Sequence, residues 1–172
     1  RHRHLDVRTR RCRAGGSHRV EQALQRSAGG RRAACRLAGR AGLASGTLPE
    51  PVEFLGVKLG LPICEDGWLP SVCTHLAAQG AELLISVNGS PYEIDKDDRR
   101  LEEVFATRVA ETGLPLIFLN RVGGQDELVF DGGSFVVAAD GTVVAAAPSF
   151  EEGAYWLQMD FGIHPARISG PA

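Results

Sequence analysis

Residues 57–88 read VKLGLPICEDGWLPSVCTHLAAQGAELLISVN, and the succession of patterns within them decides the fold class. Val57 to Ile63 is apolar and β-branched enough to predict a strand. Leu69 to Gln79 places apolar residues on one helical face and is followed by Gly80, a residue that often closes helices. Leu83 to Val87 is a continuous apolar run between turn formers, which predicts a second, buried strand parallel to the first.

The alternation extends to both sides of this stretch. Val52 to Leu55 predicts a short strand before it, and a long amphipathic helix that ends at Gly113 follows it. Three further strand-like runs come next, at residues 114–119, 129–138 and 142–147. Strands that alternate with helices are typical of an α/β fold.

Charge divides the chain into two unlike parts. Residues 1–46 hold twelve arginines and no lysine against Asp6 and Glu21, a net charge of +10, whereas the remainder has a net charge of −12. The first part also has no sustained apolar period, which is typical of a disordered or poorly specified segment. We therefore expect an Arg-rich segment at 1–46, one α/β domain at 47–160 and a tail at 161–172.

Three interpretations of the Arg-rich segment remain open. A block of like charge can be a nucleic-acid arm, although no aromatic residues are interleaved to stack on bases. An Arg-rich, acid-poor segment can also be a transit peptide. The third interpretation is translation in the wrong frame, since one choice of codons for Val20 to Ala28 with one base skipped encodes a tyrosine-asparagine-alanine sequence. The encoding DNA, read in three frames, distinguishes the third interpretation from the others.

Length and composition exclude several classes. The 172 residues are enough for about one domain. No run of about 18 apolar residues occurs, so we expect no membrane span. No secretory signal is recognisable, and a reducing cytoplasm is the expected compartment. The cysteines show no metal-ligand spacing, so we expect no metal site; they are Cys12, Cys35, Cys64 and Cys73.

Cys64 is the candidate nucleophile. It lies at the end of a predicted buried strand and just before a predicted helix, where helix amide groups favour the thiolate form of a cysteine. The alternative is that Cys64 is a small buried hydrophobe, as most free cysteines are. Cys73 lies within the predicted helix and is better explained by core packing.

Two stretches carry a resemblance to a known family. Ile63-Cys64-Glu65-Asp66, with Trp68 close behind, and Asn120 to Ser134 together resemble the glutaminase half of glutamine-dependent NAD+ synthetases, within the nitrilase or carbon-nitrogen hydrolase superfamily. The resemblance covers about residues 48–159. It implies a nitrilase-like αββα sandwich, here incomplete on its N-terminal side, in which Cys64 attacks an amide carbon.

The same resemblance assigns substrate contacts. Ser90, directly before Pro-Tyr, and Lys96, six positions on, match residues that hold glutamine, and Tyr92 is expected to order this loop. A loop that leaves the carboxyl end of a parallel strand is where open α/β sheets place ligands. The alternatives are a turn residue for Ser90 and a solvated surface lysine for Lys96.

The second stretch has a general part and a specific part. The wider superfamily shares the positions Asn120, Gly123, Phe130, Gly132 and Ser134. The resemblance implies that Gln125-Asp126-Glu127-Leu128-Val129 separates NAD+ synthetases from ordinary aliphatic amidases and nitrilases. Its polarity predicts a loop that carries or gates something near the pocket, and the alternative is a well-solvated hairpin loop.

Other elements of the family pattern are not matched. The resemblance implies a glutamate base and a lysine before the cysteine, but the first lysine in this chain is Lys58, within a predicted strand. We therefore expect this chain alone to be inactive. No cofactor is expected in this domain, because ATP and deamido-NAD+ would bind a synthetase domain that the sequence does not match. The expected partners are L-glutamine, a synthetase domain and other subunits of a homo-oligomer, with no nucleic acid. A non-catalytic interaction module and a standalone amidase are the alternatives.

Overall fold

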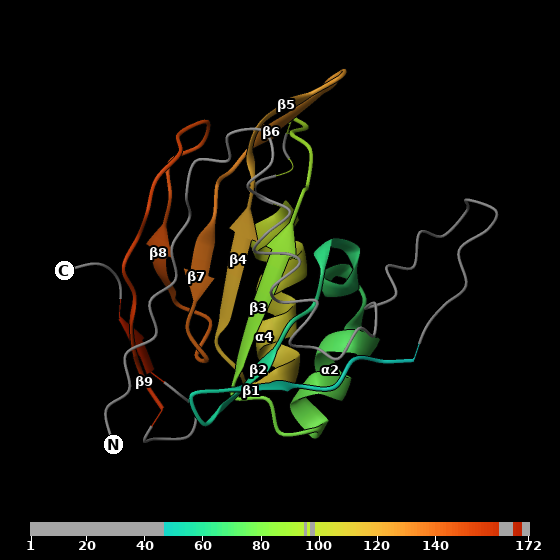
Figure 1. Cartoon of the computed structure of the whole chain (residues 1–172), viewed down its shortest axis with the longest axis vertical. Coiled ribbons are helices and arrows are strands. Elements are labelled where there is room, and N and C mark those ends of the chain that lie inside the picture. The colour runs from blue at the N-terminus through green and yellow to red at the C-terminus, as the bar shows by residue number, and fades with distance from the viewer. Residues whose placement is uncertain (1–46, 95, 97–98, 162–166, 170–172) are drawn as a thin grey trace.

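The computed structural model describes residues 47–94, 96, 99–161 and 167–169, and its main feature is a six-stranded sheet (Figure 1). Its strands, in spatial order, are β1 (Val52–Phe54), β2 (Val57–Gly60), β3 (Leu83–Asn88), β4 (Leu116–Asn120), β7 (Phe135–Val137) and β8 (Val143–Ala146). The three strands β2, β3 and β4 are parallel, and β1, β7 and β8 extend the sheet in antiparallel fashion. The α/β class is confirmed.

Helices cover one face of this sheet. They are the 3₁₀ helix η1 (Cys64–Trp68), α2 (Pro70–Ala78), the π-helical segment η2 (Arg99–Phe105) and α4 (Ala106–Thr112), which continues η2 and ends at Gly113 with φ +65° (Figure 1). Their apolar side chains pack on alternate residues of the strands, because successive strand residues point to opposite faces. The fully buried members of this helix-side core include Leu76, Leu84, Phe105, Val109, Leu116, Phe118 and Val137.

The opposite face has its own apolar core. Leu83, Ile117 and Val136 point to this side, and Leu157 and Met159 from the C-terminal part pack against them. Strand β9 (Gln158–Asp160) pairs there with β10 (Arg167–Ser169) in a separate two-stranded sheet. The described residues thus supply one helix layer and one main sheet of the expected sandwich.

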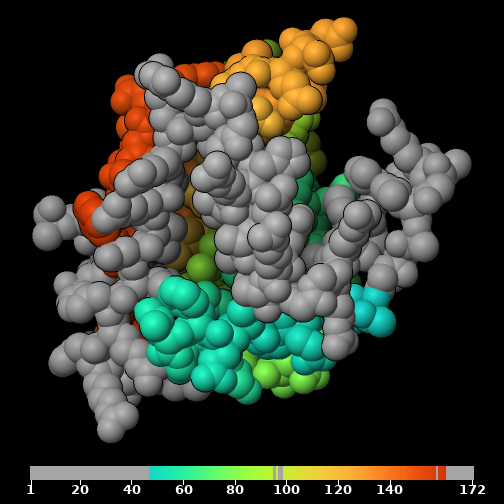
Figure 2. All heavy atoms as spheres, viewed as in Figure 1, coloured from blue at the N-terminus to red at the C-terminus, as the bar shows by residue number. Residues whose placement is uncertain are grey.

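The predicted strand 129–138 is wrong, because the chain breaks within it. Gly132 and Gly133 have φ values of +74° and +57°, which separate β6 (Leu128–Asp131) from β7. A Cβ atom on Gly132 would lie 2.5 Å from Cγ2 of Val122, so the bend requires glycine. Strand β6 instead pairs with β5 (Val122–Gln125), which the sequence pattern did not predict, and the hairpin projects beyond the main sheet (Figures 1 and 2).

The predicted strand 57–63 is shorter than expected. Strand β2 ends at Gly60, yet the chain returns to the sheet three residues later, where Ile63 forms a parallel bridge with Val87. Pro62 contributes its carbonyl oxygen to this contact and accepts a hydrogen bond from the N–H of Val87 at 3.2 Å. The chain is therefore held to β3 up to the residue before Cys64.

Some expectations fall outside the described residues. They concern the Arg-rich segment 1–46 with Cys12 and Cys35, and most of the tail 161–172. Within the part of the chain that the structure describes, no helix is long and apolar enough to cross a membrane.

Candidate functional site

The candidate site lies where three parallel strands end. Ile63 bridges Val87 beside the end of β3, and Asn88 pairs with Asn120 at the end of β4. Cys64 and Ser90 come one and two residues after these strand ends, and therefore lie at the same edge of the sheet. This edge is where open parallel sheets bind ligands.

Cys64 has a strained backbone. Its φ is +49°, in the left-handed region that residues with a Cβ atom rarely adopt, and its side chain is partly exposed. The predicted helix Leu69 to Gln79 is observed as α2, but Cys64 does not directly precede it: Cys64 is the first residue of the five-residue 3₁₀ turn η1, and α2 begins at Pro70. Strained non-glycine residues of this kind cluster at functional sites.

Asp66 holds the turn that carries Cys64. Its Oδ2 accepts a hydrogen bond from the N–H of Ile63 at 3.2 Å, and its own N–H donates to the carbonyl oxygen of Ile63 at 3.0 Å. The Asp66 side chain is buried, and this burial raises the pKa of its carboxyl group, with a smaller contribution from the neighbouring charge of Glu65. Glu65 itself is half-buried beside Cys64.

Gly67 and Trp68, which follow Asp66, pack the turn against the helix-side core. A Cβ atom on Gly67 would lie 2.6 Å from the ring of Phe105, so this position requires close approach of backbone and ring. Trp68 is half-buried against the helix-side core, and the guanidinium carbon of Arg99 lies 6.0 Å from the centroid of its ring. These contacts explain why the stretch after Cys64 reads Glu-Asp-Gly-Trp.

Ser90 is buried, and Asn120 holds its backbone. Oδ1 of Asn120 accepts a hydrogen bond from the N–H of Ser90 at 2.9 Å, and Nδ2 donates to the carbonyl oxygen of Ser90 at 3.2 Å. The N–H of Asn120 donates to Oγ of Ser134 at 2.9 Å. Asn120 and Ser134 thus join the end of β4 to the Ser90 loop and to the start of β7.

Arg100 and Asp131 also belong to this site, and sequence reasoning missed both. Nη1 of Arg100 lies 2.7 Å from Oδ2 of Asp131, and both side chains are buried. Arg100 also donates hydrogen bonds to Oγ and the carbonyl oxygen of Ser90. The available signal was an aspartate at the end of the apolar run Leu128–Phe130, where only a buried partner makes the charge tolerable.

Lys96 lies on the loop that follows Ser90. Its Nζ is 2.6 Å from Oε1 of Glu93, and only 11% of its side chain is exposed. This hydrogen bond and the charge of Lys96 lower the pKa of Glu93. The structure therefore places Lys96 in an ion pair with its neighbour, and its approach to a substrate would require that pair to open.

Tyr92 connects this loop to the β5–β6 hairpin. Its backbone N–H donates to the carbonyl oxygen of Val129 at 2.7 Å, and its ring meets that of Phe150 edge-on at 5.4 Å between centroids. These contacts are those of a residue that orders the loop.

The distinguishing segment 125–128 forms the tip of the β5–β6 hairpin. Asp126, with φ +54°, and Glu127 make a two-residue turn between paired Gln125 and Leu128. All four residues are exposed, and Oε1 of Gln125 accepts a hydrogen bond of 3.4 Å from Arg121. The tip is solvated, as one of the two interpretations of this segment expects.

Neither Lys58 nor Cys73 lies at the site. Lys58 is exposed, and its backbone exchanges hydrogen bonds with Glu82, at the start of β3 and thus at the end of the sheet opposite Cys64. Cys73 has no exposed surface within α2, and burial raises the pKa of its thiol to about 11. Its interpretation as a core residue is consistent with both observations.

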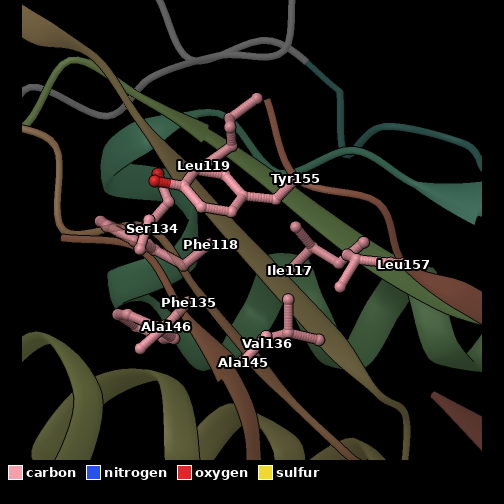
Figure 3. A pocket seen from close by; sticks show the side chains of 11 residues that line it. Ile117, Phe118, Leu119, Ser134, Phe135, Val136, Ala145, Ala146, Tyr155 and Leu157 are labelled. Carbon is pink, nitrogen blue, oxygen red and sulfur yellow. The ribbon is translucent and has the colours of Figure 1, made fainter. Parts of the chain in front are cut away.

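An apolar pocket lies elsewhere, on the face of the sheet opposite the helices. Side chains of Ile117, Val136, Ala145 and Leu157 line it, and the ring of Tyr155 lies across one end (Figure 3). It contains no ionisable group except Tyr155 and does not include Cys64, so it does not belong to the candidate site. Among the described residues, no three His, Cys, Asp or Glu side chains gather as a set of metal ligands.

Comparison with known sequences points to one family. A family model described as carbon-nitrogen hydrolase matches residues 1–162. A curated relative, the glutamine-dependent NAD(+) synthetase of Rhodobacter capsulatus, is 50% identical over 117 residues, which are 68% of this chain and 21% of that protein. The chain thus spans about a fifth of the length of the curated relatives that it matches.

Solved structures share the fold. The glutamine-dependent NAD+ synthetase from Acinetobacter baumannii, in complex with ADP, is 32% identical with a TM-score of 0.67 over 76% of this chain and 24% of that one. An amidase variant from Nesterenkonia sp. AN1 is 28% identical with a TM-score of 0.56 over 66% of this chain and 42% of that one. That amidase is described with the acetamide moiety of fluoroacetamide added covalently at its active-site cysteine. The nitrilase-like sheet is therefore confirmed.

Proposed function

Because the chain belongs to the carbon-nitrogen hydrolase family, we propose that it is the glutaminase part of a glutamine-dependent NAD+ synthetase. The observation that carries the proposal is the strained Cys64 at the carboxyl edge of the parallel strands, beside the buried Ser90 loop. The likeness to NAD+ synthetases in sequence and structure supports glutamine as the substrate rather than another amide. Binding of ATP and deamido-NAD+ belongs to the part of those proteins that this chain does not span.

In the proposed reaction, the thiolate of Cys64 attacks the side-chain amide carbon of glutamine. A carbon-sulfur bond forms, the carbon-nitrogen bond breaks, and ammonia leaves with the proton that the thiol gave up. Water then attacks the thioester, releases glutamate and restores the thiol. Ser90 and Lys96 hold the amino-acid end of glutamine, with Lys96 exchanging its contact with Glu93 for one with the substrate. The ammonia passes to a synthetase domain, in a cytoplasmic homo-oligomer.

Catalysis by this chain alone is expected to be close to background. The reaction needs a base for the thiol and a donor for the oxyanion, and loss of one oxyanion donor typically costs about 100- to 1000-fold in rate. Lys58 and Lys96 are the chain's lysines; Lys58 lies at the wrong end of the sheet, and Lys96 is paired with Glu93. A chimera that joins the N-terminal strands and lysine segment of an intact relative at Leu48 should gain activity.

Two measurements test this function. The 172-residue chain should be labelled at Cys64 by 6-diazo-5-oxo-L-norleucine, a glutamine-shaped electrophile, and L-glutamine should protect it whereas acetamide should not. The chimera should convert glutamine to glutamate and lose that activity in the variant Cys64→Ala. Equal protection by acetamide would favour a standalone amidase. Robust glutamine hydrolysis by the 172-residue chain would show that other residues, with Glu65 and Lys58 the nearest candidates, fill the missing roles.

A further inference from the structure

The guanidinium group of Arg100 contacts two segments that are distant in the sequence. Its Nε lies 3.3 Å from Oγ of Ser90, and its Nη2 lies 3.0 Å and 2.9 Å from the carbonyl oxygens of Ser90 and Pro91. Its Nη1 and Nη2 also donate to the two carboxylate oxygens of Asp131, at 2.7 Å and 3.1 Å. The exposed fractions of the two side chains are 1% and 0%.

Stability alone is a weak reason for such a pair. Desolvation of two charges offsets most of their attraction, and apolar residues of similar volume often stabilise a core as well or better. Arg100 engages neutral acceptors of Ser90 and Pro91, the first residues of the proposed substrate loop. We propose that Arg100 is a positioning residue, clamped by Asp131, that fixes the loop 90–96 for glutamine binding. This inference rests on the proposed function.

The position of Arg100 in the chain strengthens the proposal. The loop begins at Ser90 and runs through Lys96 to the π-helical segment η2, in which Arg100 is the second residue. The side chain of Arg100 therefore reaches back to residues ten and nine positions earlier in the chain, at the start of the loop. Departures from α-helical geometry to π-helical turns occur frequently at functional sites.

Asp131 fixes the other side of the clamp. It ends β6, pairs with Val122 in the hairpin, and its carbonyl oxygen accepts a hydrogen bond from the N–H of Phe150 at 2.6 Å. The sharp turn at Gly132 follows directly, so the backbone on both sides of Asp131 fixes the position from which its carboxylate projects. Arg100 thereby ties the substrate loop to the base of the β5–β6 hairpin.

Arg108 offers a matched control on the adjoining helix. It is also a buried arginine, and its Nε lies 3.2 Å from Oε2 of Glu111, but this ion-pair partner lies within α4 and not in the loop 90–96. The variant Arg100→Gln removes a buried ion pair, and Arg108→Gln removes a partly buried one. A merely structural role of Arg100 would give the two variants the same properties.

The test measures labelling of Cys64 in the full 172-residue chain by intact-mass spectrometry. For 6-diazo-5-oxo-L-norleucine, the half-saturating concentration should rise about 10- to 100-fold in Arg100→Gln and in Asp131→Asn, because a misplaced binding loop costs this much. The limiting rate, and the rate with iodoacetamide, should stay close to those of the unaltered chain. Arg100→Lys keeps the charge but not the planar guanidinium group, so its half-saturating concentration should lie between those of the unaltered chain and Arg100→Gln. Arg108→Gln should leave the half-saturating concentration unchanged.

The outcomes separate this inference from the function on which it rests. A saturable reaction in the unaltered chain, with the same half-saturating concentration in Arg100→Gln, would overturn the inference alone, and so would an equal rise in Arg108→Gln. Labelling of the unaltered chain that never saturates would overturn both the proposed function and this inference. If Arg100→Gln does not fold, amide exchange across residues 90–96 is measured in Arg100→Lys and compared with that in Arg108→Gln. Faster exchange in Arg100→Lys that is confined to the loop supports the clamp. Unchanged exchange in the loop refutes it.

Discussion

The side-chain amide of Asn120 lies across the backbone of Ser90, accepting a hydrogen bond from its N–H at 2.9 Å and donating one to its carbonyl oxygen at 3.2 Å. A side chain at the end of β4 thus substitutes for the next residue pair of the β3–β4 ladder. It satisfies the backbone N–H of Ser90, which would otherwise be buried without an acceptor because Ser90 leaves the sheet at this point. The geometry of the loop therefore depends on Asn120 as well as on Arg100.

The variant Asn120→Ala should lose about 1 to 3 kcal/mol of unfolding free energy, because it leaves the buried N–H of Ser90 without its acceptor. Denaturant unfolding followed by circular dichroism measures this. Asp140→Ala is the control, since Oδ1 of Asp140 accepts a hydrogen bond from the N–H of Thr142 at 2.9 Å at an exposed turn, and its loss should cost little. Equal losses in the two variants would contradict the role given to Asn120.

Cys64 should be alkylated by iodoacetamide much faster than Cys73 at neutral pH. Cys73 is fully buried, and its raised pKa, about 11, keeps it protonated until the solution becomes strongly alkaline. The thiolate is the reactive form, so the Cys73 rate should increase with pH up to that range. Peptide mapping of partially labelled protein gives both rates, and faster labelling of Cys73 at pH 7 would show that Cys64 is wrongly assigned.

Cys64→Gly should be more stable than Cys64→Ala, by about 1 kcal/mol, because glycine adopts the left-handed region without the steric cost that a Cβ atom brings. Thermal unfolding of the two variants measures the difference. At Ala110, an exposed position in α4, glycine should instead be less stable than alanine, since glycine is unfavourable in a helix. A Cys64→Gly variant that is less stable than Cys64→Ala would argue against the strained backbone.

Asp66→Asn should change how stability depends on pH. Burial raises the pKa of the Asp66 carboxyl group above its ordinary 3.8, so its favourable contribution is present below that value and is lost as pH rises through the higher folded-state pKa. The neutral asparagine should therefore gain stability relative to the unaltered chain between acidic and neutral pH. Thermal unfolding across this range provides the measurement.

Asp140 provides the control of opposite sign. Its pKa is lowered by the hydrogen bond from the N–H of Thr142, so its contribution is present above its ordinary pKa and lost as pH falls. Asp140→Asn should therefore lose stability, relative to the unaltered chain, as pH rises. A parallel response of the two variants would contradict the assignment for Asp66.

Gly67→Ala should destabilise the chain by about 1 to 3 kcal/mol, the usual cost of overpacking, because its Cβ would lie 2.6 Å and 2.9 Å from two atoms of the Phe105 ring. Gly124→Ala is the control, since the nearest atom to a Cβ there is the carbonyl oxygen of Leu128 at 3.7 Å. Denaturant unfolding compares the two. A neutral Gly67→Ala would mean that Phe105 moves aside at little cost.

Periodicity was a good guide to the parallel core of the fold. The buried runs at 83–87 and 114–119 and the helix before Gly80 each coincide closely with an observed element. Their apolar residues are local, and burial on one or two faces determines the pattern directly. The predicted strand 129–138 was wrong because Asp131-Gly132-Gly133-Ser134 interrupts its apolar residues, and the positive φ angles of the two glycines turn the chain there.

The candidate site was predictable only in part. Cys64 stood out by its place between a predicted strand and a predicted helix together with the family resemblance, and Ser90 by the resemblance; the structure places both at one edge of the sheet. Arg100 and Asp131 could not be found in the same way. Arg100 occurs in a stretch rich in charge and Asp131 ends an apolar run, so no local pattern indicates that the two side chains form a pair. Long-range pairing is a property of the fold, and a single sequence does not display it.

The contacts that hold the Ser90 loop connect distant parts of the chain: Ser90 and Asn120 are 30 residues apart, and Arg100 and Asp131 are 31. The β1–β2 hairpin, by comparison, closes over a two-residue turn. Contacts between residues that are far apart in the sequence form slowly, because the chain loses conformational entropy in closing the loop before the contacts stabilise it. During synthesis from the N-terminus, the Cys64 thiol therefore emerges well before Asp131 exists. The Ser90 loop can therefore take its final position only after the chain through Asp131 has been synthesised.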